Sequence, residues 1–192
     1  MTDPVRVGIL ISGRGTNMAT LVHASTVADC PYRVVCVLSN VEDAGGLKLA
    51  ADAGVPTWAK SHKGIPRAEF DRLLDAELRA ANVELIALAG YMRLLSPEFI
   101  SGWKGRILNV HPSLLPLYKG LDTHARAIAA GDMEAGCSVH VVTPELDDGP
   151  VIAQARVPIL PGDTPDLLAD RVLAEEHKLY AVALADYARS LR

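Results

Sequence analysis

The stretch that decides the fold is RVGILISGRGTN, residues 6–17, because it joins a short apolar run to a turn with two glycines. Residues 6–11 are apolar enough to predict a strand that is covered on both faces. A helical pattern over residues 17–25 follows directly after the turn. A strand, a tight loop and a helix in this order predict the first half of a β-α-β unit.

The same alternation continues along the rest of the chain. Further strands are predicted at 32–38, 85–89 and 106–110, and helices at 47–53, 66–80, 123–130 and 164–188. Within 66–80, four apolar residues recur at helical spacing and predict a buried stripe: Phe70, Leu73, Leu74 and Leu78. The helix at 123–130 has Asp122 as its expected N-cap and Gly131 at its end.

The last third of the chain changes character, with strand-like runs at 138–143 and 151–158. The polar stretch 144–150 joins them, either as a long hairpin or as a functional loop framed by two strands. The whole pattern predicts one α/β domain over residues 1–192. We expect a doubly wound, mainly parallel sheet with helices on both faces and late strands that are partly antiparallel.

Composition excludes several classes of protein. Nineteen Lys and Arg against 23 Asp and Glu give a net charge of −4, without a run of like charges, so a nucleic-acid surface is not expected. No stretch approaches the ~18 apolar residues of a membrane span, and no signal peptide precedes the first strand. Three cysteines without a C-x-x-C pair predict buried thiols, no metal site and a cytoplasmic location.

The loop at 11–17 is a candidate anion site. Gly13 and Gly15 let backbone amides approach a ligand, and the following helix start adds unpaired N–H groups. A dinucleotide fingerprint would need a third glycine where the chain has Met18, and a phosphate-binding Walker loop would need Gly-Lys-Ser/Thr. A single phosphate monoester therefore fits best, and a merely structural tight turn is the alternative.

The richest chemistry lies in NVHPSLLP, residues 109–116. On a strand, residues i and i+2 face the same side, so Asn109 and His111 should project together at a strand's carboxyl end. An amide N–H can stabilise an oxyanion, and a histidine can transfer a proton to a nitrogen leaving group. The alternative for His111 is a hydrogen-bonded core histidine. The chain has no G-x-S-x-G or H-E-x-x-H motif, so direct transfer to a nucleophile is favoured.

A third partner for this pair is expected in the late polar loop. Glu145, Asp147 and Asp148 are the candidates, and spacing alone does not choose among them. A carboxylate close to a histidine raises the pKa of its ring and fixes its tautomer. A solvated acidic turn without a catalytic role is the alternative.

At these residues the chain closely resembles the phosphoribosylglycinamide formyltransferase family, folate-dependent enzymes of purine synthesis. The resemblance covers nearly the whole chain, with its motifs in order: ISGRGTN at 11–17, AGYMRLLS at 89–96, NVHPSLLP at 109–116, GLDTH at 120–124, GCSVH at 136–140 and ELDDGPVI at 145–152. It implies a formyltransferase fold with a phosphate-binding half over about 1–100 and a folate-binding and catalytic half over about 101–192.

The resemblance also implies roles for individual residues. The phosphate of 5'-phosphoribosylglycinamide would lie on Gly15, Thr16 and Asn17, and Glu176 would bind the ribose hydroxyls. Leu173 stands where some relatives carry a polar side chain that contacts the nucleotide, so one contact is in doubt. The residues implied for the cosubstrate 10-formyltetrahydrofolate are Arg67, Arg93, the backbone of Met92, Leu94 and Leu95, and a pterin slot of Leu88, Phe99, Ile107 and Val142.

The implied chemistry agrees with the reading of the residues. The substrate amine would attack the formyl carbon, Asn109 would donate to the oxyanion, and His111 would protonate N10 of the folate. The active-site Asp of the family maps onto Asp147, which would raise the pKa of His111 and relay the amine proton. His140 is expected to support the site from behind, with a direct role as the alternative. Small-molecule substrates are the expected partners, and the chain is expected to be a monomer or a homodimer.

Two other functions remain open at this stage. Methionyl-tRNA formyltransferase and formyltetrahydrofolate hydrolase share the catalytic module, but each normally carries an additional domain for which 192 residues leave no room. A non-catalytic nucleotide-binding module would use only the loop at 11–17. It would leave Asn109, His111 and Asp147 unexplained.

Overall fold

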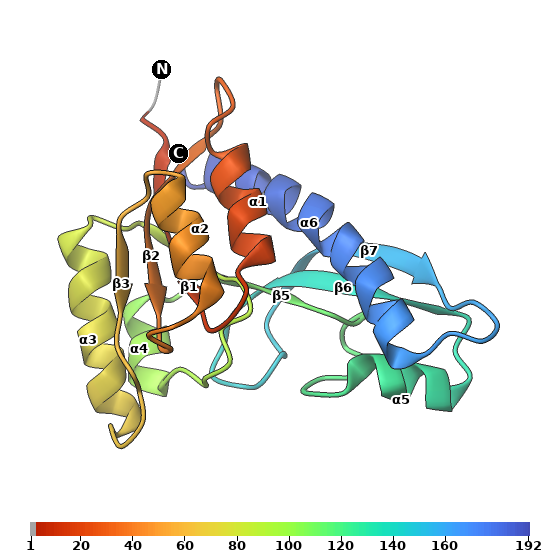
Figure 1. Ribbon diagram of the computed structural model, residues 1–192. Helices are drawn as coiled ribbons and strands as arrows, with labels where there is room; N and C mark the ends of the chain where they lie inside the picture. Colours follow the sequence, from red (N-terminus) through yellow and green to blue (C-terminus); the bar gives the residue numbers. More distant parts are fainter. Residues whose placement is uncertain (1–2) are drawn as a thin grey trace.

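The protein, described by a computed structural model over residues 3–192, is a seven-stranded sheet covered by helices (Figure 1). The strand order is β3-β2-β1-β4-β5-β6-β7. The first five strands in this order pair in parallel, and β6 pairs antiparallel with β5 and with β7. The elements are β1 (Val5–Ile11), α1 (Thr16–Ala24), β2 (Tyr32–Ser39), α2 (Gly45–Asp52), β3 (Thr57–Ala59), α3 (Arg67–Ala80), β4 (Leu85–Leu88), α4 (Pro97–Gly102), β5 (Ile107–His111), α5 (Thr123–Ala130), β6 (Glu134–Val141), β7 (Val151–Pro158) and α6 (Pro165–Ser190). The predicted fold class is confirmed.

Two elements are absent from the sequence-based prediction. β3 has three residues, too few for a period to be visible, and exists because it pairs with the end of β2. α4 has six residues and is capped by Ser96, whose side chain accepts a hydrogen bond from Phe99 N. The prediction for β6 was also wrong at both ends. The strand begins at Glu134, because Glu134 and Ala135 pair with the far end of β7.

The start of α5 differs from expectation as well. Asp122 occupies the N-cap position, but its side chain makes no capping hydrogen bond and its φ is +57°. The turn is held instead by Arg126, whose guanidinium donates to the carbonyls of Lys119 and Leu121. Gly131 ends the helix in the left-handed conformation with φ +74°, as predicted.

The two faces of the sheet carry separate apolar layers. α1, α2 and α6 cover one face, and α3 and α4 cover the other (Figure 1). The stripe of α3 is buried at Phe70, Leu74 and Leu78, and Leu73 is half-buried. Cys36 and Cys137 are buried as predicted, but Cys30 is only half-buried because it lies in the loop after α1. The sheet is therefore sandwiched, as its apolar central strands require.

A buried hydroxyl joins α6 to the centre of the sheet. Tyr180 is fully buried, and its hydroxyl donates within 3.1 Å of both the Leu88 and the Leu108 carbonyl oxygens. These carbonyls belong to β4 and β5, the neighbouring strands that lead into the loops described below. Burial raises the pKa of Tyr180 well above its ordinary value, so the hydroxyl stays protonated and remains a donor.

We expect Tyr180→Phe to lower the free energy of unfolding by about 1–2 kcal/mol, because interior carbonyls lose a donor while the apolar ring is kept. Urea denaturation measures the change. Tyr187→Phe is the matched control, since the Tyr187 hydroxyl donates to Gly105 O at 2.8 Å from a half-buried position and should cost less. Equal losses in the two variants would contradict a special role for the buried hydroxyl.

Candidate active site

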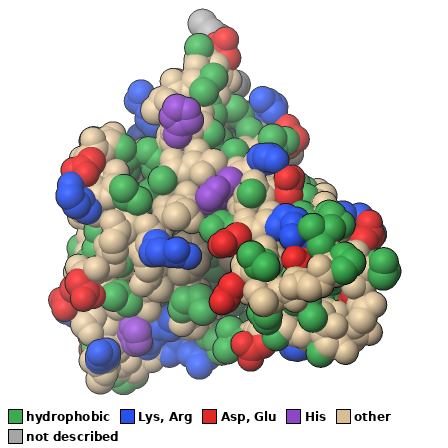
Figure 2. Space-filling view, turned by 45° about the vertical axis from the view of Figure 1, so that its right-hand side comes forward, with side chains coloured by type: hydrophobic (Ala, Val, Ile, Leu, Met, Phe, Trp, Pro, Cys, Tyr) green, Lys and Arg blue, Asp and Glu red, His purple; other side chains and the backbone are tan. Residues whose placement is uncertain are grey.

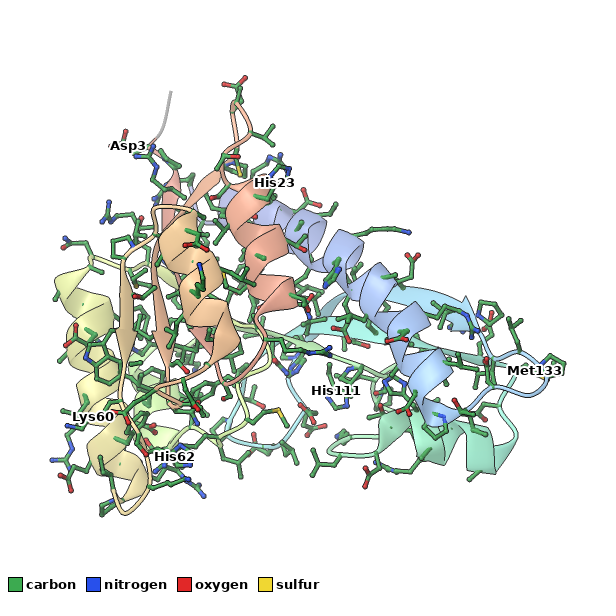
Figure 3. The ribbon with its side chains drawn as sticks, in the orientation of Figure 1. Asp3, His23, Lys60, His62, His111 and Met133 are labelled. Atoms are coloured by element: carbon green, nitrogen blue, oxygen red, sulfur yellow. The ribbon has the colours of Figure 1, made fainter. Side chains whose placement is uncertain are left out.

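The carboxyl ends of β1, β4 and β5 lie side by side, because these strands are parallel neighbours. Ligands of open α/β sheets bind at this edge. His111 ends β5 and lies in the middle of the molecule, between the strands that carry α1 to α4 and the part formed by α5, β6 and β7 (Figure 3). The loops after β1, β4 and β6 are the other contributors to the site.

Four side chains form one polar cluster at this edge. Nδ1 of His111 lies 3.4 Å from Oδ2 of Asp147, and Nε2 of His140 lies 3.6 Å from Oδ1 of the same carboxylate. Asn109 Nδ2 lies 3.2 Å from His140 Nε2. The side chains of His111, Asp147 and His140 are less than one-tenth exposed. The structure thus brings together Asn109, His111 and Asp147, and it adds His140 as a link between them.

Acceptor groups lie near both ring nitrogens of His111. Its Nε2 lies 3.0 Å from the carbonyl oxygen of Tyr118, and its Nδ1 faces the Asp147 carboxylate. A carbonyl and a carboxylate can only accept hydrogen bonds, so either ring nitrogen can donate toward its neighbour when it carries a proton. The imidazolium form of His111 is the form that can donate a proton to a leaving group.

The protonation of His140 is affected most by its burial. Burial lowers the pKa of its ring, outweighing the opposing effect of Asp147, and favours the neutral form. Its Nδ1 lies 3.2 Å from the carbonyl oxygen of Val141, which fixes the proton on Nδ1. Nε2 then has a free lone pair that accepts from Asn109 Nδ2. His140 therefore orients the Asn109 amide, whose second N–H remains available to a ligand.

The backbone of the late polar loop, residues 144–150, places the Asp147 side chain beside the histidines. Asp147 has φ +49°, and its Oδ2 accepts a hydrogen bond from Gly120 N at 2.9 Å. Gly149 lies so close to the Val141 carbonyl oxygen that a Cβ there would overlap it, so this loop needs glycine to pack on β6. Glu145 is exposed, and Asp148 forms an ion pair with Lys119. Of the three candidate carboxylates, only Asp147 reaches the histidines.

The glycine loop after β1 has the geometry of an anion site. Gly15 is the N-cap of α1 with φ +74°, and a Cβ on it would lie 2.7 Å from Gly46 Cα at the start of α2. Gly46 N donates to Gly13 O at 3.0 Å, which fixes the loop against α2. The first amides of α1, at Thr16 and Asn17, lack partners within the helix and are available to an anion.

Asn17 and Glu176 form a buried pair between α1 and α6. Asn17 Nδ2 donates to Glu176 Oε2 at 2.7 Å, whereas Asn17 Oδ1 is buried without a partner. Glu176 is 7% exposed, and burial raises the pKa of its carboxyl group. Because the Asn17 side chain faces α6, only its backbone N–H is free to contact an anion on the glycine loop. Leu173 is half-buried one turn earlier on α6.

The four residues implied for a pterin slot are buried or half-buried in the apolar core, and the segment 91–95 follows β4. The slot residues belong to one apolar cluster on the α3 face: Leu88, Phe99, Ile107 and Val142. In the segment 91–95, Met92 and Leu94 are exposed and Leu95 is buried. The Arg93 guanidinium lies over the Phe70 ring and donates to the carbonyls of His62 and Ile65, so it braces the neighbouring loop. Arg67 is exposed at the first residue of α3.

Several residues of this region carry no sequence signal that could have revealed them. Ser12 and Asn40 are hydrogen-bonded at 2.6 Å although 28 residues separate them. Tyr118 and Gly120 act through backbone groups, which no side-chain type identifies. Within residues 3–192, no cluster of three or more His, Cys, Asp or Glu side chains could hold a metal ion. No helix in the same range is both long and apolar enough to cross a membrane.

One face of the molecule is mixed in charge. Figure 2 shows acidic, basic and apolar side chains interspersed on one face, without a continuous basic area. This distribution agrees with the net charge of −4. An anionic ligand would therefore depend on local groups, such as the amides of the glycine loop, and not on a general positive field.

Comparisons with known proteins agree with this geometry. The formyl transferase family model matches residues 5–184. The chain is 43% identical to the phosphoribosylglycinamide formyltransferase of Escherichia coli, over 96% of this chain and 87% of the relative. It is 44% identical to the trifunctional purine biosynthetic protein adenosine-3 of Gallus gallus, over 95% of this chain but only 18% of that longer protein.

A solved structure shares the whole architecture. The phosphoribosylglycinamide formyltransferase of Brucella melitensis superposes with a TM-score of 0.93 at 48% sequence identity, covering 97% of this chain and 96% of the other. The matched residues span the glycine loop and the cluster around His111. On sequence and on structure, this chain belongs to the formyl transferase family.

Proposed function

We propose that the protein transfers the formyl group of 10-formyltetrahydrofolate to the amine of 5'-phosphoribosylglycinamide. The observation that carries the proposal is the chain of contacts from Asn109 through His140 and Asp147 to His111. It lies at the carboxyl edge of the sheet, in the region of the glycine loop and the apolar slot. The two relatives named above as phosphoribosylglycinamide formyltransferases support the same activity.

The residues divide the chemistry between them. The substrate amine attacks the formyl carbon, and the free Asn109 N–H donates to the oxygen as it becomes an oxyanion. His111 gives a proton to N10 of the folate as the bond from N10 to the formyl carbon breaks. Asp147 stabilises the His111 imidazolium and relays the proton that the amine loses. The products are the formylated nucleotide and tetrahydrofolate, and no metal takes part.

The two substrates bind on either side of this cluster. The nucleotide phosphate lies on the amides of Gly15, Thr16 and Asn17, and Glu176 accepts from the ribose hydroxyls. The folate pterin enters the apolar slot, with Arg67 near its glutamate. The residues proposed to hold the folate are Arg67, Leu88, Met92, Arg93, Leu94, Leu95, Asn109 and Val142.

The wider setting of the reaction is part of the same proposal. We place the protein in the cytoplasm as a monomer or a homodimer that acts on small molecules. Residues 1–192 form one domain, in which about 1–100 provide the phosphate site and about 101–192 provide the catalytic residues. In this assignment the first half also contributes the two arginines and the 91–95 segment to the folate site.

An assay of folate release with three acceptors tests the activity. The release of tetrahydrofolate is followed by absorbance with 5'-phosphoribosylglycinamide, with water alone and with charged initiator tRNA. We expect release only with the first acceptor. Release with water or with tRNA would instead indicate a hydrolase or a tRNA formyltransferase.

The catalytic roles predict large losses of rate without loss of folding. Asn109→Ala should lower kcat by about 10²- to 10³-fold, the usual effect of removing an oxyanion donor. His111→Ala should lower it by about 10²- to 10⁴-fold, the usual contribution of a general acid. His23→Ala, at an exposed position on α1, is the control and should keep full activity. Near-normal turnover in either active-site variant would show that the assignment of roles is wrong.

The Glu176 carboxylate predicts opposite effects on stability and on binding. In Glu176→Gln the amide N–H₂ can donate to the unpartnered Asn17 Oδ1, and no buried charge remains. We expect the free energy of unfolding at pH 7 to rise by about 0.5–2 kcal/mol. The KM for the nucleotide should rise about tenfold, because hydrogen bonds to a charged group are lost.

The gain in stability of Glu176→Gln should depend on pH in a definite direction. Because the pKa of Glu176 is raised by folding, its ionisation makes the native protein less stable as pH rises above the ordinary glutamate pKa. The advantage of Glu176→Gln should therefore shrink as pH falls toward ~4.3, where the carboxyl group of the unfolded chain also becomes protonated. Glu175→Gln, at a residue paired with Lys178 on the surface, is the matched control and should change neither quantity. A destabilised Glu176→Gln would refute the argument.

A further inference from the structure

Ser12 lies in the glycine loop by sequence, but its hydrogen bonds are with a different segment. Its backbone N donates to Gly90 O at 3.1 Å, and its Oγ accepts from Met92 N at 2.8 Å. Gly90 has φ +71°, which turns the chain just after β4. These two bonds fix the start of the segment 91–95. Met92 N–H is thereby used within the protein, so only the Met92 carbonyl is free for a ligand.

The Ser12 hydroxyl is held in one orientation. It donates its single proton to Asn40 Oδ1 at 2.6 Å, which leaves an oxygen lone pair for Met92 N–H. Asn40 is 2% exposed, and its Nδ2 lies 2.9 Å from His62 Nδ1. The amide of Asn40 is therefore fixed by a second partner. Figure 3 shows His62 at the edge of the molecule beside α3, away from His111.

Other side chains hold the remainder of the same segment. Arg93 donates to the carbonyls of His62 and Ile65 at 3.2 and 3.1 Å. Asp71 accepts from Ser96 N at 2.6 Å at the far end. Met92 is 71% exposed, so apolar packing does little to fix its position. The start of the segment depends on Ser12.

We propose that Ser12 is a positioning residue of the folate site, although it belongs to the loop that would bind the nucleotide phosphate. Its hydroxyl sets the path of 91–95, the backbone of which would contact the folate. The phosphate relies on backbone amides after Gly15, which do not need this hydroxyl. The inference rests on the proposed function and adds to it that one loop serves both substrates through different groups.

Calorimetric binding of each ligand separately tests the inference. Ser12→Ala should weaken the binding of tetrahydrofolate, kept anaerobic, about three- to tenfold, as expected for one lost hydrogen bond. The binding of 5'-phosphoribosylglycinamide should change less than about twofold, and kcat at saturation should stay within about twofold of the wild-type value. Ser12→Thr, which keeps a hydroxyl, should restore folate binding.

A second measurement reads the hydrogen bond without a ligand. Hydrogen exchange of the Met92 amide, followed by NMR, should be at least several-fold faster in Ser12→Ala and should return toward the wild-type rate in Ser12→Thr. Ser25→Ala is the matched control, because the Ser25 hydroxyl donates to Val22 O at 2.7 Å from a half-buried position at the end of α1. It should alter neither ligand affinity nor Met92 exchange.

The outcomes separate this inference from the proposed function. If the wild-type protein binds neither ligand, the proposed function fails, and Met92 exchange still reports on the Ser12 contact. If the wild-type protein binds both ligands and Ser12→Ala binds folate normally, only the inference fails. An equal loss of both ligands, a loss of the nucleotide alone, or unchanged Met92 exchange would also overturn it.

Discussion

The active-site cluster depends on the antiparallel register between β5 and β6, which places Asn109 opposite His140 and His111 opposite Ser138. A slip of one residue would turn the side chains of either strand to the other face of the sheet. The same pairing directs the chain after β6 back across the end of β5, where Asp147 meets His111. A β-bulge between Val139 and His140 in the pairing with β7 lies at the same point.

Buried hydrogen-bonding groups hold this register in place. Ser138 Oγ accepts from Leu115 N at 3.0 Å and donates to Ser113 O at 2.7 Å, which fixes the chain just after His111. Tyr180 ties α6 to β4 and β5 from the other side. Burying polar groups costs little free energy when each group has a hydrogen-bond partner and much when one has none. These contacts therefore favour a single arrangement of the strand ends.

Local contacts also govern how charge is distributed around the site. The protein carries a net charge of −4, yet the two proposed substrates are anions. Fixed dipoles at the α1 start and individual arginines can hold anions without a positive surface. Carboxylates near the site are nearly buried and have close partners, Asp147 the His111 ring at 3.4 Å and Glu176 the Asn17 amide at 2.7 Å. Little negative charge then faces the ligands from these positions.

Some features followed from local pattern alone. The periods of apolar residues gave the central strands and α3, and the i, i+2 spacing placed Asn109 and His111 on one side of a strand end. β3 and α4 were not predicted, because segments of three and six residues are too short to show a repeating pattern of apolar positions. The prediction that Asp122 caps α5 was wrong. Aspartate favours the N-cap position, but with φ at +57° the Asp122 side chain makes no capping hydrogen bond.

The sequence by itself determined the α/β alternation, the glycine loop and the chemical types in the catalytic motif, because these depend on neighbours within a few residues. Only the tertiary structure decided which of three loop carboxylates meets His111, that His140 orients Asn109, and that Ser12 contacts Met92 across 80 residues of chain. The physical reason is that these contacts join loops at the ends of different strands. Their distances depend on strand order, register and loop path, which no local pattern encodes.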